Sequence, residues 1–566
     1  MKRNSWIKGL ACGVCCLAAS LVPAQAQLLT GGAVFNRDIM INPDFTALSR
    51  PQTFGTARAM AMGGAFVSLG ADLTAMSLNP AGLGMYQHNE VSVSPLLSVS
   101  HAATSGTDPW SSNDKTRFAL AEIGAAINLF EGAGRGVTSV TLGLGLNRVA
   151  DFNTRYSYSS DRRYDGTMVP SIADLFALQM NTYGILPAAG AGGNPNGRLD
   201  YADPFFWPAV LGYKSAMTHV VDDPNGPFWE PDALGPRASI LRSVDAFDTG
   251  SINEFNFSIG ANFNNLVYFG ASIGVQSVHK SSTFIYGEDY GYFANGDDGY
   301  AYGPGGMLAT QLEYADLWQR TVLDGVGINF KLGVIVRPVS GLRLGVALHT
   351  PTYYSLERSY QAGMEYSLLA NDPAYKDESA SLSSPVQYDE AGDTWDFVSP
   401  TRLMFGASYA FGRFAIVSLD YERDWYNGIR VKNVPAGSDL GPEDYKRAFR
   451  ENYRAANTLR AGIEVRPLPT LAVRAGYGTT SSMLRNEQAV YEQPQLTSSN
   501  YFTLGLGFNL SRMISLDVAY QHLTDRQTSY YLFYGDTGND ATGIWSERYN
   551  TSFTRHFVTL SLGVHF

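Results

Sequence analysis

The mature part of this 566-residue chain is expected to contain no cysteine, because Cys12, Cys15 and Cys16 all lie near its start. Charged residues make up only 16% of the chain, against about 25% in an average soluble protein. Downstream of residue 26, no segment approaches the roughly 18–20 uninterrupted apolar residues of a membrane-spanning helix. No basic run of five or more residues occurs, which argues against nucleic acid as a partner. These absences exclude a disulfide-stapled domain and a helical membrane bundle, and they argue against a polyanion-binding role.

The abundant residue types favour a β-barrel in a membrane. Aromatic side chains make up 13% of the chain, with 33 Tyr and 30 Phe, and there are 58 Gly. So many aromatic residues argue against intrinsic disorder. Few charges, many Tyr and Gly and no spanning helix are together typical of the outer membrane of a Gram-negative bacterium, where barrels cross the bilayer with strands.

Residues 1–26 have the pattern of a secretory signal peptide. A basic start is followed by an apolar stretch over residues 9–22 and then by Ala24-Gln25-Ala26, which fits an A-x-A cleavage site. The mature chain is therefore expected to begin at Gln27, without the three cysteines. A lipid anchor on one of these cysteines is the alternative, but none follows a Leu-x-small sequence directly.

Fourteen segments alternate apolar and polar residues with the period of two that β-strands require. In the last one, Val558, Leu560, Leu562, Val564 and Phe566 alternate with Thr, Ser, Gly and His. A last strand that ends on Phe is typical of outer-membrane barrels, and it predicts the barrel-assembly machinery as a partner. The predicted strands cover residues 90–103, 116–130, 137–152, 253–264, 266–285, 325–338, 341–356, 400–411, 413–430, 456–467, 470–485, 500–511, 513–531 and 553–566.

The connections between these strands alternate in length, which predicts the orientation of the barrel. Connections after even-numbered strands are short, whereas those after odd-numbered strands are long. Short turns belong to the periplasmic side and long loops to the exterior, so both termini are expected on the periplasmic side. The longest loop, residues 153–252, is too apolar for a solvated tail and too irregular for another hairpin. We predict that it forms a folded external cap.

Residues 27–89 precede the first strand, do not alternate and are rich in small side chains. They include a short predicted helix over residues 69–77, which the run Asn79-Pro80-Ala81-Gly82 is expected to stop. A barrel of fourteen strands leaves a lumen that its own side chains do not fill. We therefore predict that residues 27–89 form a hatch, or plug, inside a transmembrane antiparallel barrel made of residues 90–566.

The sequence from residue 55 to 83, GTARAMAMGGAFVSLGADLTAMSLNPAGL, resembles the N-terminal hatch of the FadL/TodX family of outer-membrane transporters. Proteins of that family have an A-x-G-G-A/E-x-A run, an acidic residue and N-P-A before the first strand. The resemblance implies a fourteen-stranded barrel with the hatch inside it, and uptake of long-chain fatty acids and other hydrophobic molecules. The chain departs from typical members in its size, mainly through the loop at 153–252. The hatch-motif residues are Gly63, Gly64, Asp72, Asn79, Pro80, Ala81 and Gly82.

Charged residues on the lumen phase of two adjacent predicted strands are candidates for contacts inside the barrel. They are expected to pair with one another or with the hatch, whereas Leu459 and Ile463 fall on the lipid phase. Binding of a ligand carboxylate by one of the arginines is the alternative. These candidate lumen charges are Arg460, Glu464, Arg466 and Arg474.

Other motifs carry less weight. The G-x-S-x-G match at residues 270–274 lies within an alternating strand, not in the strand-to-helix turn of a hydrolase. Gly143 and Gly145 are expected to mark a bulge, a kink, a close backbone approach or a lateral opening in the wall. The acidic pairs at 288–289 and 297–298 could hold a cation, although a solvated loop is favoured. No two histidines have metal-ligand spacing, so no metal site and no cofactor are expected.

The sequence thus favours an all-β outer-membrane transporter and not an enzyme. Each buried methylene contributes about 0.8 kcal/mol to binding, so long-chain molecules such as fatty acids are the natural ligands. Passive diffusion gated by the hatch is the predicted mechanism, with a hydrophobic small molecule and outer-membrane lipid as partners. A general porin would instead conduct steadily without an apolar ligand, and a surface-adhesion barrel would place its function in the 153–252 loop.

Overall fold

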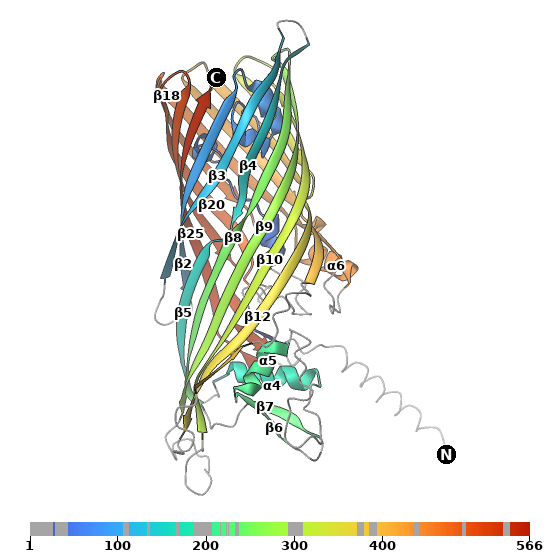
Figure 1. The fold of residues 1–566 in the computed structure, drawn as a ribbon, viewed down its shortest axis with the longest axis vertical. Helices are drawn as coiled ribbons and strands as arrows, with labels where there is room; N and C mark the ends of the chain where they lie inside the picture. The colour runs from blue at the N-terminus through green and yellow to red at the C-terminus, as the bar shows by residue number, and fades with distance from the viewer. Residues whose placement is uncertain are drawn as a thin grey trace, which may run out of the picture.

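The fold is a closed antiparallel barrel of fourteen strands, extended at one end by a layered cap (Figure 1). The computed structural model describes residues 26–28, 43–105, 112–132, 136–165, 169–184, 206–215, 217–221, 224, 226–231, 237–292, 310–370, 379–383, 393–433, 441–488, 494–535 and 544–566. The predicted signal peptide, apart from Ala26, lies outside these residues. We call the end with the short connections the turn end, and the end with the cap the loop end.

The fourteen predicted strands are confirmed, since each coincides with one strand of the wall. Three of the fourteen are interrupted and carry two labels each, and the ring closes where β2 pairs with β25, with Val91 opposite Val564. The wall consists of β2 (Glu90–Ser105), β3 (Ser112–Glu131), β4 (Val137–Asp151) continued by β5 (Thr154–Arg163), β8 (Arg237–Phe263), β9 (Val267–Tyr292), β10 (Thr310–Val336), β11 (Leu342–His349) continued by β12 (Tyr353–Ala370), β14 (Asp393–Val398) continued by β15 (Arg402–Phe411), β16 (Ala415–Trp425), β18 (Ala455–Leu468), β19 (Leu471–Thr480), β20 (Leu496–Asn509), β21 (Ile514–Gln527) and β25 (Arg548–His565).

Apolar side chains face outward and polar side chains face inward along the wall. On β18, Leu459 and Ile463 are 49% and 41% exposed, whereas the residues that follow each of them, Arg460 and Glu464, are buried. A soluble protein would cover such apolar rows with another layer, but here they form a belt around the barrel. The belt is the surface that contacts lipid. No helix among the described residues is long and apolar enough to span a membrane.

Several strands extend further toward the loop end than the sequence pattern predicts. β8 begins at Arg237 instead of residue 253, β10 begins at Thr310 instead of residue 325, and β12 continues to Ala370. β5 pairs with β8 over residues 154–163, so the first and last parts of the predicted 153–252 loop are strands. The alternation fails there because the extension leaves the lipid belt, and its outer face therefore becomes polar. β13 (Ser379–Ser383) pairs with β12 at the same end.

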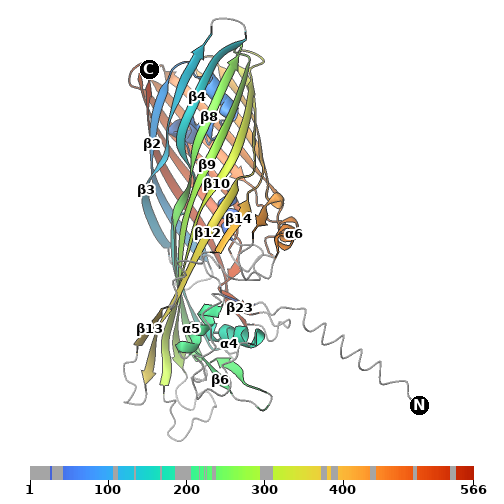
Figure 2. The same cartoon turned by 45° about the vertical axis from the view of Figure 1, so that its right-hand side comes forward.

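The rest of the 153–252 stretch contributes a cap that packs against this extension. Its described elements are α4 (Ile172–Thr182), α5 (Trp207–Lys214) and a hairpin of β6 (Thr218–Val221) and β7 (Phe228–Pro231). Phe176, Trp207 and Trp229 are each 1% exposed and belong to one hydrophobic cluster with Tyr286 of β9. Figures 1 and 2 show the cap helices beside the narrow end of the barrel, away from the C-terminus.

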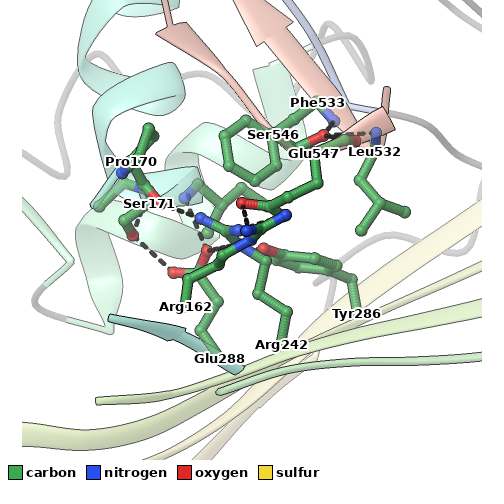
Figure 3. Close-up of polar contacts among 12 residues, drawn as sticks. Arg162, Pro170, Ser171, Arg242, Tyr286, Glu288, Leu532, Phe533, Ser546 and Glu547 are labelled. Carbon is green, nitrogen blue, oxygen red and sulfur yellow. Dashed lines mark hydrogen bonds and ion pairs between the residues drawn. The ribbon is translucent and has the colours of Figure 1, made fainter. Parts of the chain in front are cut away.

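A buried ionic cluster joins the cap to the wall extension (Figure 3). Arg242 of β8 is fully buried and pairs with Glu547, whose other oxygen lies 2.8 Å from Arg162. Glu288 of β9 accepts hydrogen bonds from the Ser171 hydroxyl, at 2.5 Å, and from the backbone N–H of residue 172. The expectation of a solvated or cation-binding loop at Glu288 is therefore wrong, because this carboxylate caps the start of α4. Asp297 and Asp298 lie outside the described residues.

The start of the described chain lies at the loop end, which corrects the expectation that both termini are periplasmic. β1 (Ala26–Leu28) pairs with β23 (Phe533–Gly535), which in turn pairs with β24 (Ile544–Trp545). β22 (Tyr530–Tyr531) adds to β25 nearby. Phe566, at the opposite end, exchanges two backbone hydrogen bonds with Asn89. The lengths of the connections give the direction of the strands alone. They carry no information on residues 26–28, which precede the first strand of the wall and lie at the loop end.

A small helical region stands outside the wall at the loop end of the belt. The 3-10 helix η6 (Tyr426–Gly428) is followed by β17 (Arg430–Lys432), which pairs with β14, and then by α6 (Pro442–Asn452). Phe449 of α6 is fully buried and packs against Phe45 at 5.2 Å between ring centroids. Figures 1 and 2 show α6 projecting from the side of the barrel.

Candidate functional site: the segment before the barrel and the cavities around it

Residues 43–89, which we call the hatch segment, contact inward-facing groups on strands around the ring. The segment contains α2 (Pro43–Ser49), α3 (Ala57–Ala61) and two 3-10 helices, η1 (Leu73–Met76) and η2 (Pro80–Met85). The N–H of Ala57 donates to the Ser561 hydroxyl of β25 at 2.7 Å, and the Tyr501 hydroxyl of β20 donates to the Gly63 carbonyl at 2.9 Å. In Figures 1 and 2 the blue helical turns of this segment lie among the strands near the turn end.

The helix η1 ends at Met76, before the Asn79-Pro80-Ala81-Gly82 run, as expected, and the same run begins a second helix that the sequence analysis did not predict. Asn79 is the N-cap of η2: its side-chain oxygen accepts the N–H of Ala81 at 3.2 Å, and Pro80 occupies the first turn. Proline suits this position because its missing N–H is not needed there. The Asn79 amide also donates to the Val67 carbonyl at 2.6 Å, which joins two parts of the hatch segment. The predicted helix around Asp72 is present as η1.

Glycines on both sides let the hatch segment and the wall approach closely. A Cβ on Gly270 of β9 would lie 2.1 Å from the backbone of Pro80, and one on Gly476 of β19 would lie 2.3 Å from the Gly63 nitrogen. Gly63 and Gly64 have φ values of +65° and +70°, which side chains disfavour. Gly143 and Gly145 of β4 face Met76 of the segment, and the strand ladder there is continuous on both sides. The structure therefore shows close approach at these glycines.

Asp72 organises the middle of the hatch segment. Its carboxylate accepts the Thr56 hydroxyl at 2.9 Å and the Thr74 N–H at 3.0 Å, and so caps η1. The Thr74 hydroxyl donates to Glu122 of β3 at 3.1 Å, which continues the network into the wall. Burial raises the pKa of Asp72, and the nearby Arg58 opposes that rise only in part.

The four candidate lumen charges divide between two clusters. Glu464 is fully buried and accepts from Arg474 at 2.7 Å and from Arg466 at 2.8 Å, and it lies 3.3 Å from Arg58 of α3. Arg474 also reaches Asp517 of β21 at 2.5 Å. One wall carboxylate thus binds two wall arginines and one arginine of the hatch segment.

Arg460 belongs to the second cluster, which sequence reasoning missed. Its guanidinium lies 2.6 Å from Glu422 of β16, and Arg402 pairs with the same carboxylate. Asp420, two residues earlier, accepts the N–H of Val67 at 2.8 Å. Asp420, Glu422 and Asp424 are buried on the inward phase of the predicted strand 413–430. That spacing of three carboxylates on one phase is the signal that could have revealed them.

Two basic residues of the wall hold α2. The Asp44 carboxylate lies 2.7 Å from the Lys280 ammonium and 3.0 Å from the Arg358 guanidinium. Burial acts to raise the pKa of Asp44, but the two cations outweigh it and hold that pKa below its usual value. Phe45 stacks on Phe397 of β14 at 5.4 Å between centroids, so α2 also has an apolar anchor.

Three cavities lie inside the barrel around the stretch that joins α2 to α3. The deep cavity, about 750 Å³, is lined by polar groups including Glu254, Lys331 and Arg402. The side cavity, about 690 Å³, lies between residues 50–54 and the strands β16 to β21. The outer cavity, about 920 Å³, lies closer to the loop end, and its lining includes Phe152 and Phe553. Gln52 lines all three cavities, so residues 50–54 form a partition between them.

Hydrogen bonds to the wall hold this partition in place. Arg50 donates to the Thr497 carbonyl at 3.2 Å and to the Ser499 hydroxyl at 2.8 Å. The N–H of Gln52 donates to the Val149 carbonyl at 2.8 Å. The Gln52 side chain also exchanges hydrogen bonds with the backbone of Asp151, at 3.3 and 3.1 Å, and the Thr53 hydroxyl donates to Tyr501 at 3.2 Å. The partition is therefore attached to both β4 and β20.

The wall has a seam beside the outer cavity. The ladder between β3 and β4 stops at the pair Glu122–Asn147, and among the described residues β5 pairs only with β8. Side chains bridge the seam instead: Arg117 of β3 donates to the Asn153 side chain at 2.5 Å, and Lys115 donates to the Asp248 carbonyl at 2.7 Å. The outer cavity reaches this seam at residues 150–156.

Known structures share this architecture. A FadL homologue from Pseudomonas aeruginosa is similar over 92% of this chain and 100% of its own, with 12% identity and a TM-score of 0.50. The toluene transporter TodX from Pseudomonas putida has 12% identity and a TM-score of 0.47 over 92% of this chain and 100% of its own. The monoaromatic hydrocarbon channel CymD has 14% identity and a TM-score of 0.45, over 92% and 99%. No family model matches, and no curated protein matches.

The closed barrel and its apolar belt define the class: the chain is a multi-pass outer-membrane β-barrel. More narrowly, it has the fold of the FadL homologue, which confirms at the level of fold the resemblance predicted from the hatch motif.

Proposed function

We propose that this barrel carries hydrophobic or amphipathic small molecules, long-chain fatty acids among them, across the outer membrane by passive diffusion, with residues 43–89 as the hatch. The observation that supports this most is the set of three cavities around residues 50–54, on the loop side of α3. The folds of transporters for hydrophobic compounds are similar to this one. The division into a signal peptide (1–26), a hatch (27–89) and a barrel (90–566) remains part of the proposal.

The cavities suggest the order of events. A ligand enters the outer cavity, where Phe152 and Phe553 offer apolar contact, and reaches the deep cavity when residues 50–54 shift. Arg402, Arg460 and Lys331 line the deep cavity and pair there with Glu422 or Glu254, and a negatively charged head group would compete with these carboxylates for their donors. A ligand in the outer cavity can also leave through the seam between β3 and β5 into the belt.

Uptake by proteoliposomes tests the proposal. The probe is a labelled long-chain fatty acid, with glucose as the polar comparison, and the variant is Ala150→Trp in the lining of the outer cavity. Ala461→Trp is the matched control, since Ala461 is exposed on the outer face of β18 and lines none of the three cavities. We expect Ala150→Trp to slow fatty-acid uptake several-fold and the control to leave it near wild type. Equal uptake by both folded variants, or faster glucose than fatty-acid entry, would favour the porin.

The seam is tested separately by cross-linking. Because the mature chain is expected to lack cysteine, Arg117→Cys with Asn153→Cys creates a unique pair that a short bis-maleimide can join. Joining the pair should reduce transfer of the fatty acid into the bilayer, whereas modifying either single variant should not. Unchanged transfer after complete cross-linking would exclude the seam as the exit and leave the passage past the hatch.

A further inference from the structure

A patch of basic side chains lies on the outside of the barrel, just beyond the lipid belt. The whole chain is acidic, with a formal net charge of −11, so a basic patch is a local departure from its composition. Its members come from β16, β17, α6 and the segments flanking β18 and β19, and all except the half-buried Lys446 are exposed. The patch consists of Arg423, Arg430, Lys432, Lys446, Arg447, Arg450, Arg454 and Arg485.

Backbone contacts bring these segments together. Arg485 donates from its side chain to the carbonyls of Arg450 and Tyr453 at 3.1 and 3.0 Å, and Arg454 donates to the Ser482 carbonyl at 3.2 Å. Tyr453 forms an isolated bridge with Leu484. The patch is therefore a fixed surface, built where α6 packs on the wall.

Most of its charge lacks an internal counter-ion. Lys446 and Arg447 pair with Glu443 and Asp444 within α6, at 2.7 Å each. Among the described residues, the other six basic side chains have no carboxylate within ion-pair distance; these are Arg423, Arg430, Lys432, Arg450, Arg454 and Arg485. Asp396 lies opposite Lys432 in the β14–β17 ladder, and the carboxylates of Glu451 and Glu487 are exposed in the same region. Among the described residues, none of these three carboxylates forms an ion pair with the six side chains.

The position of the patch along the membrane normal follows from its place directly beyond the apolar belt. Successive outward positions on β16 are Leu419, 57% exposed, then Tyr421 and Arg423. Lys432 lies 5.9 Å above the ring of Tyr353, and Arg423 lies 5.9 Å from the ring of Trp425. Aromatic girdles of this kind mark the level where hydrocarbon gives way to head groups. Cations stacked on the girdle lie at the level of the head groups of the outer leaflet.

We infer that this patch binds the phosphate groups of outer-leaflet glycolipids. Guanidinium groups bind phosphate through two parallel hydrogen bonds, and the patch places several of them beside a surface that already contacts acyl chains. A soluble anion would make only the charge contacts, whereas a lipid would also pack its acyl chains against the apolar belt. Bound lipid would fix the barrel's depth in the membrane and hold α6 against the leaflet.

Native mass spectrometry of the detergent-purified full chain tests this inference. The probes are a diphosphorylated lipid A and the same glycolipid with both phosphates removed. The variant Arg423→Gln, Arg430→Gln, Arg450→Gln avoids Arg485 and Arg454, whose side chains hold backbone carbonyls. The matched control is Arg337→Gln, Arg413→Gln, Arg512→Gln, which removes the same charge at the turn end.

We expect the wild type and the control to prefer the diphosphorylated lipid by roughly fivefold or more, and the patch variant to lose that preference. Added salt should weaken the preference, because the contacts are exposed charges. Equal binding of both lipids by the wild type, or an unchanged preference in the patch variant, would overturn the inference. Displacement of the lipid by 10 mM inorganic phosphate would overturn the assignment to a lipid.

If the triple variant does not fold, Arg430→Gln with Arg450→Gln provides the same comparison with less disturbance. Among the described residues, neither the Arg430 nor the Arg450 guanidinium donates a hydrogen bond. The double variant should therefore fold normally. The double variant should show a reduced preference, and an unchanged one would contradict the inference. None of these readouts depends on transport, so they stand apart from the proposed function.

Discussion

The guanidinium of Arg58, in helix α3 of the hatch segment, lies 3.3 Å from the carboxylate of Glu464 on β18. Arg466 binds the same carboxylate at 2.8 Å but comes from the wall and is 43% exposed. The two arginines thus bind the two oxygens of one carboxylate, Arg58 joining the hatch segment to the barrel and Arg466 joining the wall to itself.

This pair gives the first prediction. Arg58→Gln should loosen the hatch segment and raise the frequency of conducting events in planar bilayers, because the ionic contact with the wall is lost. Arg466→Gln is the control and should leave the record unchanged, since its contact does not involve the hatch segment. An equal effect of the two variants would mean that Glu464 acts on the stability of the wall and not on the hatch.

The second prediction concerns the hydrogen bond from the Val67 N–H to Asp420, which is 2.8 Å long. Asp420→Ala leaves that buried N–H without an acceptor, at a cost of about 1–3 kcal/mol. Hydrogen exchange measured by mass spectrometry should then accelerate in peptides covering residues 60–70. Ser418→Ala is the control on the same inward face, where the hydroxyl has no hydrogen-bond partner among the described residues. Equal exchange in the two variants would show that the bond does not hold the segment.

The third prediction concerns Gly270, where a Cβ would lie 2.1 Å from the backbone of Pro80. Neither backbone can move freely, so Gly270→Ala should destabilise the seated hatch segment by about 1–3 kcal/mol. Gly428→Ala is the control, because a Cβ there meets no atom within 4 Å. Chemical denaturation in detergent would measure both. A Gly270→Ala protein as stable as the control, with equally low conductance, would show that the contact is not close in solution.

The lipid belt gives a fourth prediction. Ile463 is 41% exposed on the outer face of β18, so Ile463→Arg near the middle of the membrane should cost roughly 2–4 kcal/mol of folding free energy. Ile463→Ala removes apolar area without adding charge and should cost less. Refolding into lipid vesicles measures the difference. If the arginine variant refolds as well as the alanine variant, this face of β18 does not contact hydrocarbon.

The barrel could be predicted from the sequence because its lipid-facing strands alternate strictly, as in the last strand ending at Phe566. The strand extensions over residues 237–252 and 310–324 could not, since beyond the lipid belt no apolar outer face is required. The sequence located the hatch motif but gave no contacts for it: Val67 and Asp420 are 353 residues apart, and Arg58 and Glu464 are 406 apart. Local patterns do not encode pairings of that range.

Asn79-Pro80 shows a different limit. The residue before proline is disfavoured in a helix, and η1 indeed ends at Met76, before Asn79. The same proline is also well suited to the first turn of a new helix, which the sequence pattern did not predict. The Asn79 side chain caps that helix by accepting the N–H of Ala81.

The central claim is that residues 43–89 close the barrel. Its most direct test is the conductance of the full chain and of a variant lacking residues 43–83 in planar bilayers, with deletion of the cap hairpin 217–231 as the control. We expect the intact protein and the control to conduct little and the deletion variant to form large, steady channels, because the wall strands and Phe566 remain to complete the barrel. Equal conductance of the intact and deleted proteins would contradict the account and favour an open porin.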